Sequence, residues 1–169
     1  VEGLRGKTER TISNQRALQE LLAGDKQLKK GLHKLLGGQA DFTSDEQQEC
    51  TRLVVDDNAR ICFVSPRGSG QSMVYLLPAS MLEKRVFVVI TPRKSLFEDL
   101  MRRARQFGLD VATMSDAFNA RHKLLFGSVE DLDTKRWDSL LAAHEQHSNK
   151  VTVFLDEVHL MLLEVRFRT

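Results

Sequence analysis

The strongest constraint on the fold is a nearly unbroken apolar run, Val86–Thr91 (Val-Phe-Val-Val-Ile-Thr), which ends at Pro92. Apolar runs of this length, rich in β-branched and aromatic residues, are typical of strands that are buried on both faces. Such strands belong to parallel sheets that helices cover on both sides. The sequence therefore predicts an α/β fold with a mostly parallel central sheet.

Other parts of the chain alternate between short apolar runs and helical periodicity. The runs predict strands at 61–65, 111–114, 124–127 and 151–156, and the periodic stretches predict helices at 44–55, 71–83, 95–107 and 134–147. We expect helix 95–107 to bury Leu96, Leu100 and Phe107, and helix 134–147 to bury Trp137, Leu140 and Leu141. Strands that alternate with helices of this length predict βαβ units and a three-layer domain.

The first 41 residues are more basic than the rest of the chain, whose overall net charge is only +2. Lys26, Lys29, Lys30 and Lys34 lie at helical spacing beside leucines, before the pair at 37–38 (Gly-Gly). The lysines indicate either a surface that contacts phosphates or, as we favour, the solvated face of an amphipathic helix. We predict a basic helical segment over 1–41 and a domain over 42–169, both cut from a longer protein.

Two cysteines, Cys50 and Cys62, are too few for a disulfide framework, and we expect both to be buried and inert. Neither a membrane-spanning run nor a signal-peptide pattern occurs. We therefore expect an intracellular protein, nuclear in a eukaryote and cytoplasmic otherwise.

Residues 65–72 (Ser-Pro-Arg-Gly-Ser-Gly-Gln-Ser) connect an expected strand to an expected helix. Phosphate-binding loops follow the pattern G-x-x-x-x-G-K-[ST], in which backbone N–H groups hold the phosphates, the lysine reaches the outer ones and the hydroxyl binds Mg²⁺. Here the candidate phosphate contacts are Gly68, Ser69, Gly70, Gln71 and Ser72. Serine replaces the first glycine and Gln71 replaces the lysine, so a plain strand–turn–helix connection remains an alternative.

A second candidate site is the carboxylate pair Asp156–Glu157, which follows the apolar run 151–155. In phosphate-loop ATPases, an acid at this place holds Mg²⁺ and its neighbour orients or deprotonates the attacking water. The alternative is the acidic first turn of a helix. The pair follows a candidate phosphate loop in the expected order, and this favours the nucleotide site.

Several segments in order resemble the first RecA-like domain of superfamily 2 helicases, and among these the RecQ-type DNA helicases. They are 42–47 (Phe-Thr-Ser-Asp-Glu-Gln), 66–72, 75–79 (Tyr-Leu-Leu-Pro-Ala), 89–92 (Val-Ile-Thr-Pro), 128–130 (Ser-Val-Glu), 156–159 (Asp-Glu-Val-His, a DExH box) and 167–168 (Phe-Arg). The resemblance covers residues 42–169 and implies ATP and Mg²⁺ as cofactors, with DNA as partner.

The resemblance also implies residue roles. Gln47 would read adenine, Ser72 and Asp156 would hold Mg²⁺, Glu157 would act on the water, and His159 would couple the ATP site to the DNA site. The bound strand would run along Thr91, Pro92, Arg93, Ser128, Glu130 and Arg168.

Two departures limit the activity that we expect from this chain. The phosphate-loop lysine is absent, and the second RecA-like domain, which completes the ATP site in this family, lies outside the sequence. The resemblance therefore implies a fragment of an ATP-dependent 3′–5′ DNA helicase that is inactive alone. A catalytically dead nucleic-acid-binding scaffold and a DEAD/DEAH-type RNA helicase remain alternatives.

Overall fold

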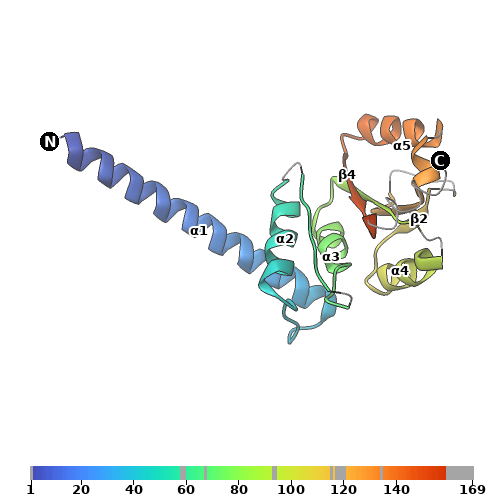
Figure 1. Ribbon diagram of the computed structural model, residues 1–169, viewed down its shortest axis with the longest axis horizontal. Coiled ribbons are helices and arrows are strands. Elements are labelled where there is room, and N and C mark those ends of the chain that lie inside the picture. Colours follow the sequence, from blue (N-terminus) through green and yellow to red (C-terminus); the bar gives the residue numbers. More distant parts are fainter. Residues whose placement is uncertain are drawn as a thin grey trace. The chain divides into compact units, whose positions relative to one another are not determined.

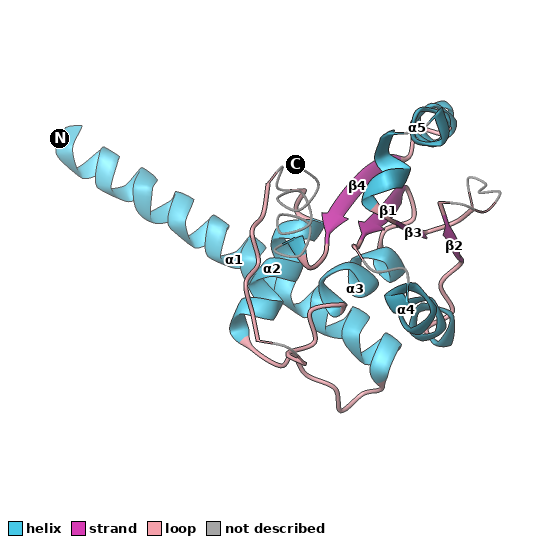
Figure 2. Ribbon diagram, turned by 45° about the vertical axis from the view of Figure 1, so that its right-hand side comes forward, coloured by secondary structure: helices cyan, strands magenta, loops and turns pink. Residues whose placement is uncertain are grey.

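The computed structural model describes residues 2–57, 60–66, 68–92, 95–114, 116, 121–133 and 135–158. By its internal contacts the chain divides into two compact units, Val1–Gln71 and Ser72–Thr169, and each is described by itself. Figures 1 and 2 show the elements of both units. Among the described residues, every helix is too short or too polar to cross a bilayer.

The first unit is helical. Its elements are α1 (Glu2–Leu36) and α2 (Asp45–Val55). Leu28 and Leu32 of α1 are buried, as are Cys50 and Val54 of α2. At the end of α1, Gly37 has a positive φ of 105°, and its N–H donates to the His33 carbonyl at 2.9 Å. Glycine is favoured at such a helix end because it adopts a positive φ without a steric cost.

The predicted strand 61–65 is wrong, because this segment is irregular in the structure. A strand needs a neighbour whose backbone can complete its hydrogen bonds, and the described elements of this unit are helices. Val64 is 88% exposed, so the apolar run is not buried either. The expectation that both cysteines are buried is also wrong, since Cys62 lies exposed in this segment and only Cys50 is covered.

The second unit contains a four-stranded, all-parallel sheet in the order β2-β3-β1-β4. The strands are β1 (Arg85–Ile90), β2 (Val111–Thr113), β3 (Leu124–Gly127) and β4 (Lys150–Leu155). Val88 of β1 stands opposite Leu125 of β3 and Val153 of β4. The predicted α/β fold with a parallel sheet is confirmed.

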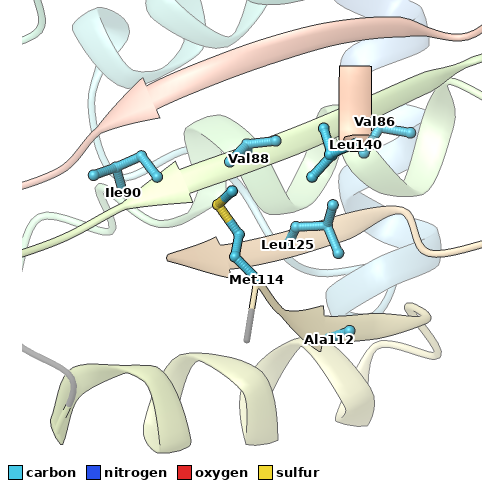
Figure 3. Packing of buried hydrophobic residues seen from close by; sticks show 7 residues of the cluster. All are labelled: Val86, Val88, Ile90, Ala112, Met114, Leu125 and Leu140. Atoms are coloured by element: carbon cyan, nitrogen blue, oxygen red, sulfur yellow. The ribbon is translucent and has the colours of Figure 1, made fainter. Parts of the chain in front are cut away.

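Helices cover both faces of this sheet. They are α3 (Met73–Met81), α4 (Ser95–Gln106) and α5 (Lys135–Gln146), with a short 3₁₀ helix, η1, at Val129–Asp133. On one face, alternate residues of β1 join Leu140 of α5 in a buried cluster of Val86, Val88, Ile90, Ala112, Met114, Leu125 and Leu140 (Figure 3). Trp137 packs against this cluster, as predicted. The expected burial of Leu141 is wrong, because this side chain lies on the outer side of α5 and is 37% exposed.

The opposite face is aromatic. Phe154 of β4 contacts Phe87 of β1 and Tyr75 of α3, with ring centroids 5.9 and 5.5 Å apart. Phe97 of α4 lies 6.4 Å from the Phe126 ring of β3. The buried stripe of α4 therefore includes Phe97, whereas Leu100 and Phe107, which we expected inside, are only half-buried. The third residue expected inside, Leu96, has a side chain that lies outside the described part of the chain.

Candidate functional site

The candidate residues form two groups, one in each compact unit. The first part is the phosphate-loop segment, residues 65–71. Its two glycines, Gly68 and Gly70, have positive φ values of 80° and 77°. This conformation suits glycine, because in other residues the Cβ would clash with the neighbouring backbone. The Ser69 N–H donates to the Pro66 carbonyl at 3.3 Å, which closes a turn in the loop.

The Gln71 side chain bonds to the start of the loop. Its Nε2 donates to the Ser65 carbonyl and to the Ser65 Oγ, both at 2.9 Å. The Ser69 Oγ donates to the same Ser65 hydroxyl at 2.8 Å. The two positions that depart from the phosphate-loop pattern, 65 and 71, are therefore bonded to each other.

The Gln47 side chain bonds to the other half of the loop. Gln47 is 2% exposed, and its Nε2 donates to the Gly70 carbonyl at 2.7 Å and to the Ser69 carbonyl at 3.4 Å. Its Oε1 accepts from the Thr43 N–H at 2.9 Å, and the Thr43 hydroxyl donates to the Ser69 carbonyl at 2.6 Å. The structure thus brings Gln47 to the loop, and its role toward adenine stays a prediction.

Local capping explains why Gln47 reaches the loop. The Ser44 Oγ accepts from the Gln47 N–H at 3.2 Å and caps α2. In a capping box, the side chain at Gln47 would return to the N–H of Ser44. Here its Oε1 takes the N–H of Thr43 instead, which leaves Nε2 directed at the loop. Thr43 was part of the segment quoted for the resemblance, yet no pattern assigned it a contact.

Ser72 begins the second unit and precedes α3. Its φ and ψ of −62° and −22° are helical, and its carbonyl accepts from the N–H groups of Tyr75 and Leu76 at 3.3 and 3.0 Å. Its hydroxyl makes no capping hydrogen bond to the helix. Ser72 therefore offers a hydroxyl that the helix end does not use.

The second part of the site is the carboxyl edge of the sheet, where three neighbouring strands end side by side. Thr91 follows β1, Ser128 follows β3 and Asp156 follows β4. The Thr91 N–H donates to the Gly127 carbonyl at 3.0 Å, and the Asp156 N–H donates to the Ile90 carbonyl at 2.8 Å. This edge is where parallel α/β sheets bind ligands.

Asp156 is half-buried at this edge. Burial raises the pKa of its carboxyl above the ordinary value of 3.8, and the neighbouring Glu157 carboxylate adds to the rise. The Glu157 N–H donates to Asp156 Oδ1 at 3.0 Å and opposes it. Glu157 has a positive φ of 52°, a backbone conformation that is costly for a residue with a side chain and is concentrated at functional sites.

Tyr75 of α3 lies near this edge, and the sequence did not reveal its relation to Asp156. It is 4% exposed, and its hydroxyl has no hydrogen-bond partner among the described residues. Burial raises the pKa of this phenol, and the charge of Asp156 raises it further. Its ring packs on Phe154, two residues before Asp156 on β4. Tyr75 belongs to segment 75–79, which resembles RecQ-type helicases, but nothing in that segment links position 75 to Asp156.

The predicted nucleic-acid contacts are only partly described. Thr91 and Ser128 are buried, Pro92 is half-buried and Glu130 is exposed on η1. The Ser128 N–H and Oγ both donate to Asp131 Oδ2, at 2.7 and 2.9 Å. Arg93, Arg168 and the predicted coupling residue His159 lie outside the described residues.

A family model for DEAD/DEAH box helicases matches residues 44–169, which is most of the chain. The chain belongs to the DEAD/DEAH box helicase family. Members of this family are nucleic-acid helicases that use ATP with Mg²⁺. The match spans the loop, the sheet edge and Gln47, and so includes every candidate residue above.

The oxygen donors of the chain fit Mg²⁺, whereas residue 71 does not fit the outer phosphates. Mg²⁺ binds proteins through one or two hard oxygens and keeps water or phosphate as its other ligands. The Ser72 hydroxyl and the Asp156 carboxylate are of that kind. In the described part of the chain, no cluster of three or more His, Cys, Asp or Glu suited to a metal occurs. Gln71 is neutral, and its Nε2 is already bonded to Ser65.

Proposed function

We propose that this chain is the first RecA-like motor domain of a 3′–5′ DNA helicase of RecQ type, and that it binds Mg-ATP and single-stranded DNA. One observation carries the proposal: Asp156 and Glu157 directly follow β4, at the same sheet edge as Thr91 and Ser128. The RecQ type rests on the resemblance of segments 75–79 and 167–168.

In this proposal each part of the chain has a separate task at the nucleotide. Backbone N–H groups of residues 68–72 hold the phosphates. Gln47 would contact adenine by exchanging bonds that its side chain now makes to Thr43, Ser69 and Gly70. Ser72 and Asp156 hold Mg²⁺, and Glu157 orients the attacking water and accepts its proton. Bound ATP supplies the phosphoanhydride bond. His159 would couple this site to the nucleic acid.

The nucleic acid would follow the strand ends. Thr91, Pro92 and Arg93 come after β1, whereas Ser128 and Glu130 come after β3, and Arg168 would contribute from the C-terminal segment. These residues would contact the backbone of the strand, which positions the protein without reading sequence. An RNA helicase of the same family would use the same edge, so the choice of DNA depends on experiment.

A second candidate function is a nucleic-acid-binding scaffold that does not hydrolyse ATP. The observation that favours it is the Gln71 amide, which bonds to Ser65 in the place where the pattern has a lysine. Hydrogen bonds of a charged donor are about twice as strong as those of a neutral one. A loop with Gln71 therefore holds the outer phosphates more weakly.

Titration with Mg-ATP separates the two candidates. The wild-type chain should bind weakly or undetectably, and Gln71→Lys should bind about 10- to 150-fold more tightly, or about 1.5–3 kcal/mol. Adding Asp156→Ala to Gln71→Lys should remove the dependence on Mg²⁺. Gln39→Lys adds the same charge at an exposed position outside the loop and serves as the control. If Gln71→Lys binds no better than Gln39→Lys, the scaffold is the function.

Nucleic-acid binding is tested with single strands of equal sequence in DNA and RNA. We expect weak binding of DNA with an affinity that falls steeply as salt rises, because contacts to phosphates release counterions. A preference for RNA would identify an RNA helicase. Absence of binding at about 50 mM salt would contradict the proposed path along the strand ends.

A further inference from the structure

The Gln71 amide nitrogen is bonded within its own loop. Its Nε2 donates to the Ser65 carbonyl and to the Ser65 hydroxyl, both at 2.9 Å, and a glutamine Nε2 has two hydrogens to give. The lysine of the usual pattern carries three donors and a positive charge. Gln71 is therefore engaged with its own chain, and its Oε1, which can only accept a hydrogen bond, is unsuited to a phosphate oxygen.

The partner of Gln71 is the other unusual residue of the loop. A glycine at position 65 would offer only a carbonyl, whereas Ser65 offers a carbonyl and a hydroxyl. The hydroxyl also accepts from the Ser69 Oγ at 2.8 Å, so the contact ties the first, fifth and seventh residues of the segment together. The two departures from the pattern thus complement each other as donor and acceptor.

The opposite side of the loop is held as well. The carbonyls of Ser69 and Gly70 accept from Thr43 and Gln47, which leaves the loop anchored along both sides by side chains of the same unit. A phosphate loop that depends on its ligand for order needs no such set of internal bonds. Here the side chains supply them.

From these contacts we infer that Ser65 and Gln71 form a latch, which fixes the loop in the absence of nucleotide and makes residue 71 a positioning residue rather than a phosphate ligand. The inference deepens the proposed nucleotide site and rests on it for its consequence, namely that phosphates are held by backbone N–H groups without a side-chain cation. The latch itself requires only the contacts within the loop.

Hydrogen exchange of the whole chain, measured by NMR without nucleotide, tests the latch. Gln71→Met keeps the length of the side chain but removes both donors, and Ser65→Ala removes one of the two acceptors. One ordinary hydrogen bond corresponds to roughly a 2- to 12-fold change in an equilibrium. We expect the backbone amides of residues 68–71 to exchange roughly 5- to 50-fold faster in Gln71→Met, and less so in Ser65→Ala.

The double variant decides whether the two residues act together. Once Gln71→Met has opened the latch, adding Ser65→Ala should change exchange by no more than about twofold, because residues that share one interaction are not additive. The exposed Gln39→Met, in the same unit, should leave the loop unchanged. Wild-type exchange rates in Gln71→Met, or effects that multiply in the double variant, would overturn the latch.

A Mg-ATP titration of Gln71→Lys, run beside the exchange experiment, separates this inference from the proposed function. Coupled exchange with tighter binding supports both. Coupled exchange without binding in any variant keeps the latch and refutes the nucleotide site. Uncoupled exchange together with tight binding by Gln71→Lys refutes the latch and keeps the nucleotide site.

Discussion

The phosphate-loop segment and the carboxyl edge of the sheet are held in place by different kinds of interaction. In the loop, side chains of Thr43, Gln47 and Gln71 donate to carbonyl and hydroxyl oxygens of Ser65, Ser69 and Gly70. At the sheet edge, Thr91 and Asp156 are fixed by main-chain hydrogen bonds to adjacent strands, over a core of apolar side chains.

This difference determines how each region responds to mutation. Apolar burial is roughly proportional to area and tolerates exchanges between hydrophobic residues of similar volume. A hydrogen-bond network depends on the donor or acceptor at each position, and loss of one leaves its partner unsatisfied. The sheet edge should therefore keep its geometry after conservative exchanges and lose much stability when a large core side chain is removed. The loop should respond to the loss of a single hydrogen-bond donor or acceptor.

The largest expected effect comes from emptying the core beneath the edge. Phe126 of β3 is fully buried and contacts the Phe97 ring, so Phe126→Ala should lower the free energy of unfolding by about 3–5 kcal/mol. Urea unfolding followed by the fluorescence of Trp137, the single tryptophan, measures it in this unit. Leu141→Ala, 37% exposed on α5, is the control and should cost less than about 1 kcal/mol.

An intermediate effect is expected in the loop from Gly70→Ala. The positive φ at this position disfavours any side chain, and the new Cβ would lie 2.5 Å from Gln47 Nε2. We expect the free energy of unfolding of α1 and α2 to fall by about 1–3 kcal/mol. Far-ultraviolet circular dichroism measures this unfolding. In a Gln47→Ala background the clash is absent, so Gly70→Ala should there cost only the part due to φ. If Gly70→Ala cost nothing in that background, φ would carry no strain.

The smallest effect is expected at the edge itself, from Asp156→Asn. Because the folded chain raises the pKa of this carboxyl above 3.8, the folded state binds its proton more tightly than the unfolded state does. The ionised form therefore costs stability above the folded pKa, and this cost disappears as the pH falls below 3.8. We expect a small gain in Tm at pH 7 that vanishes at low pH.

The matched control for this pH dependence is Glu145→Gln, a carboxylate exposed on α5. It should leave the difference in Tm between pH 7 and low pH close to that of the wild-type chain. A gain for Asp156→Asn that persisted below pH 3.8 would mean that packing, rather than charge, causes it.

The sheet and its helices could be predicted from the sequence because apolar runs and helical periodicity report burial directly. Strands β1 to β4 were expected within one or two residues of their observed ends. The run at 61–65 has a similar composition, but a strand also needs a partner, and composition does not reveal partners. Likewise, the periodicity of α4 predicted the helix, but the side chains that it assigned to the core, Leu100 and Phe107, are only half-buried.

The candidate site was predictable in its residues but not in their contacts. The order of motifs identified Gln47, Gln71 and Asp156, whereas the bond from Gln71 to Ser65 depends on the path of the loop between them. The relation of Tyr75 to Asp156 depends on how α3 packs on β4. Such contacts arise from tertiary structure, which local patterns do not encode.

The strand order also has a consequence for biosynthesis. Phe87 of β1 pairs with Leu124 of β3, 37 residues later, and with Thr152 of β4, 65 residues later. A ribosome synthesises the N-terminal side first, so the apolar strand β1 is made before either of its neighbours. Until β3 and β4 follow, both edges of β1 stay open to other chains. A chaperone that protects the nascent β1 would therefore have to act until β4 has been synthesised as far as Leu155.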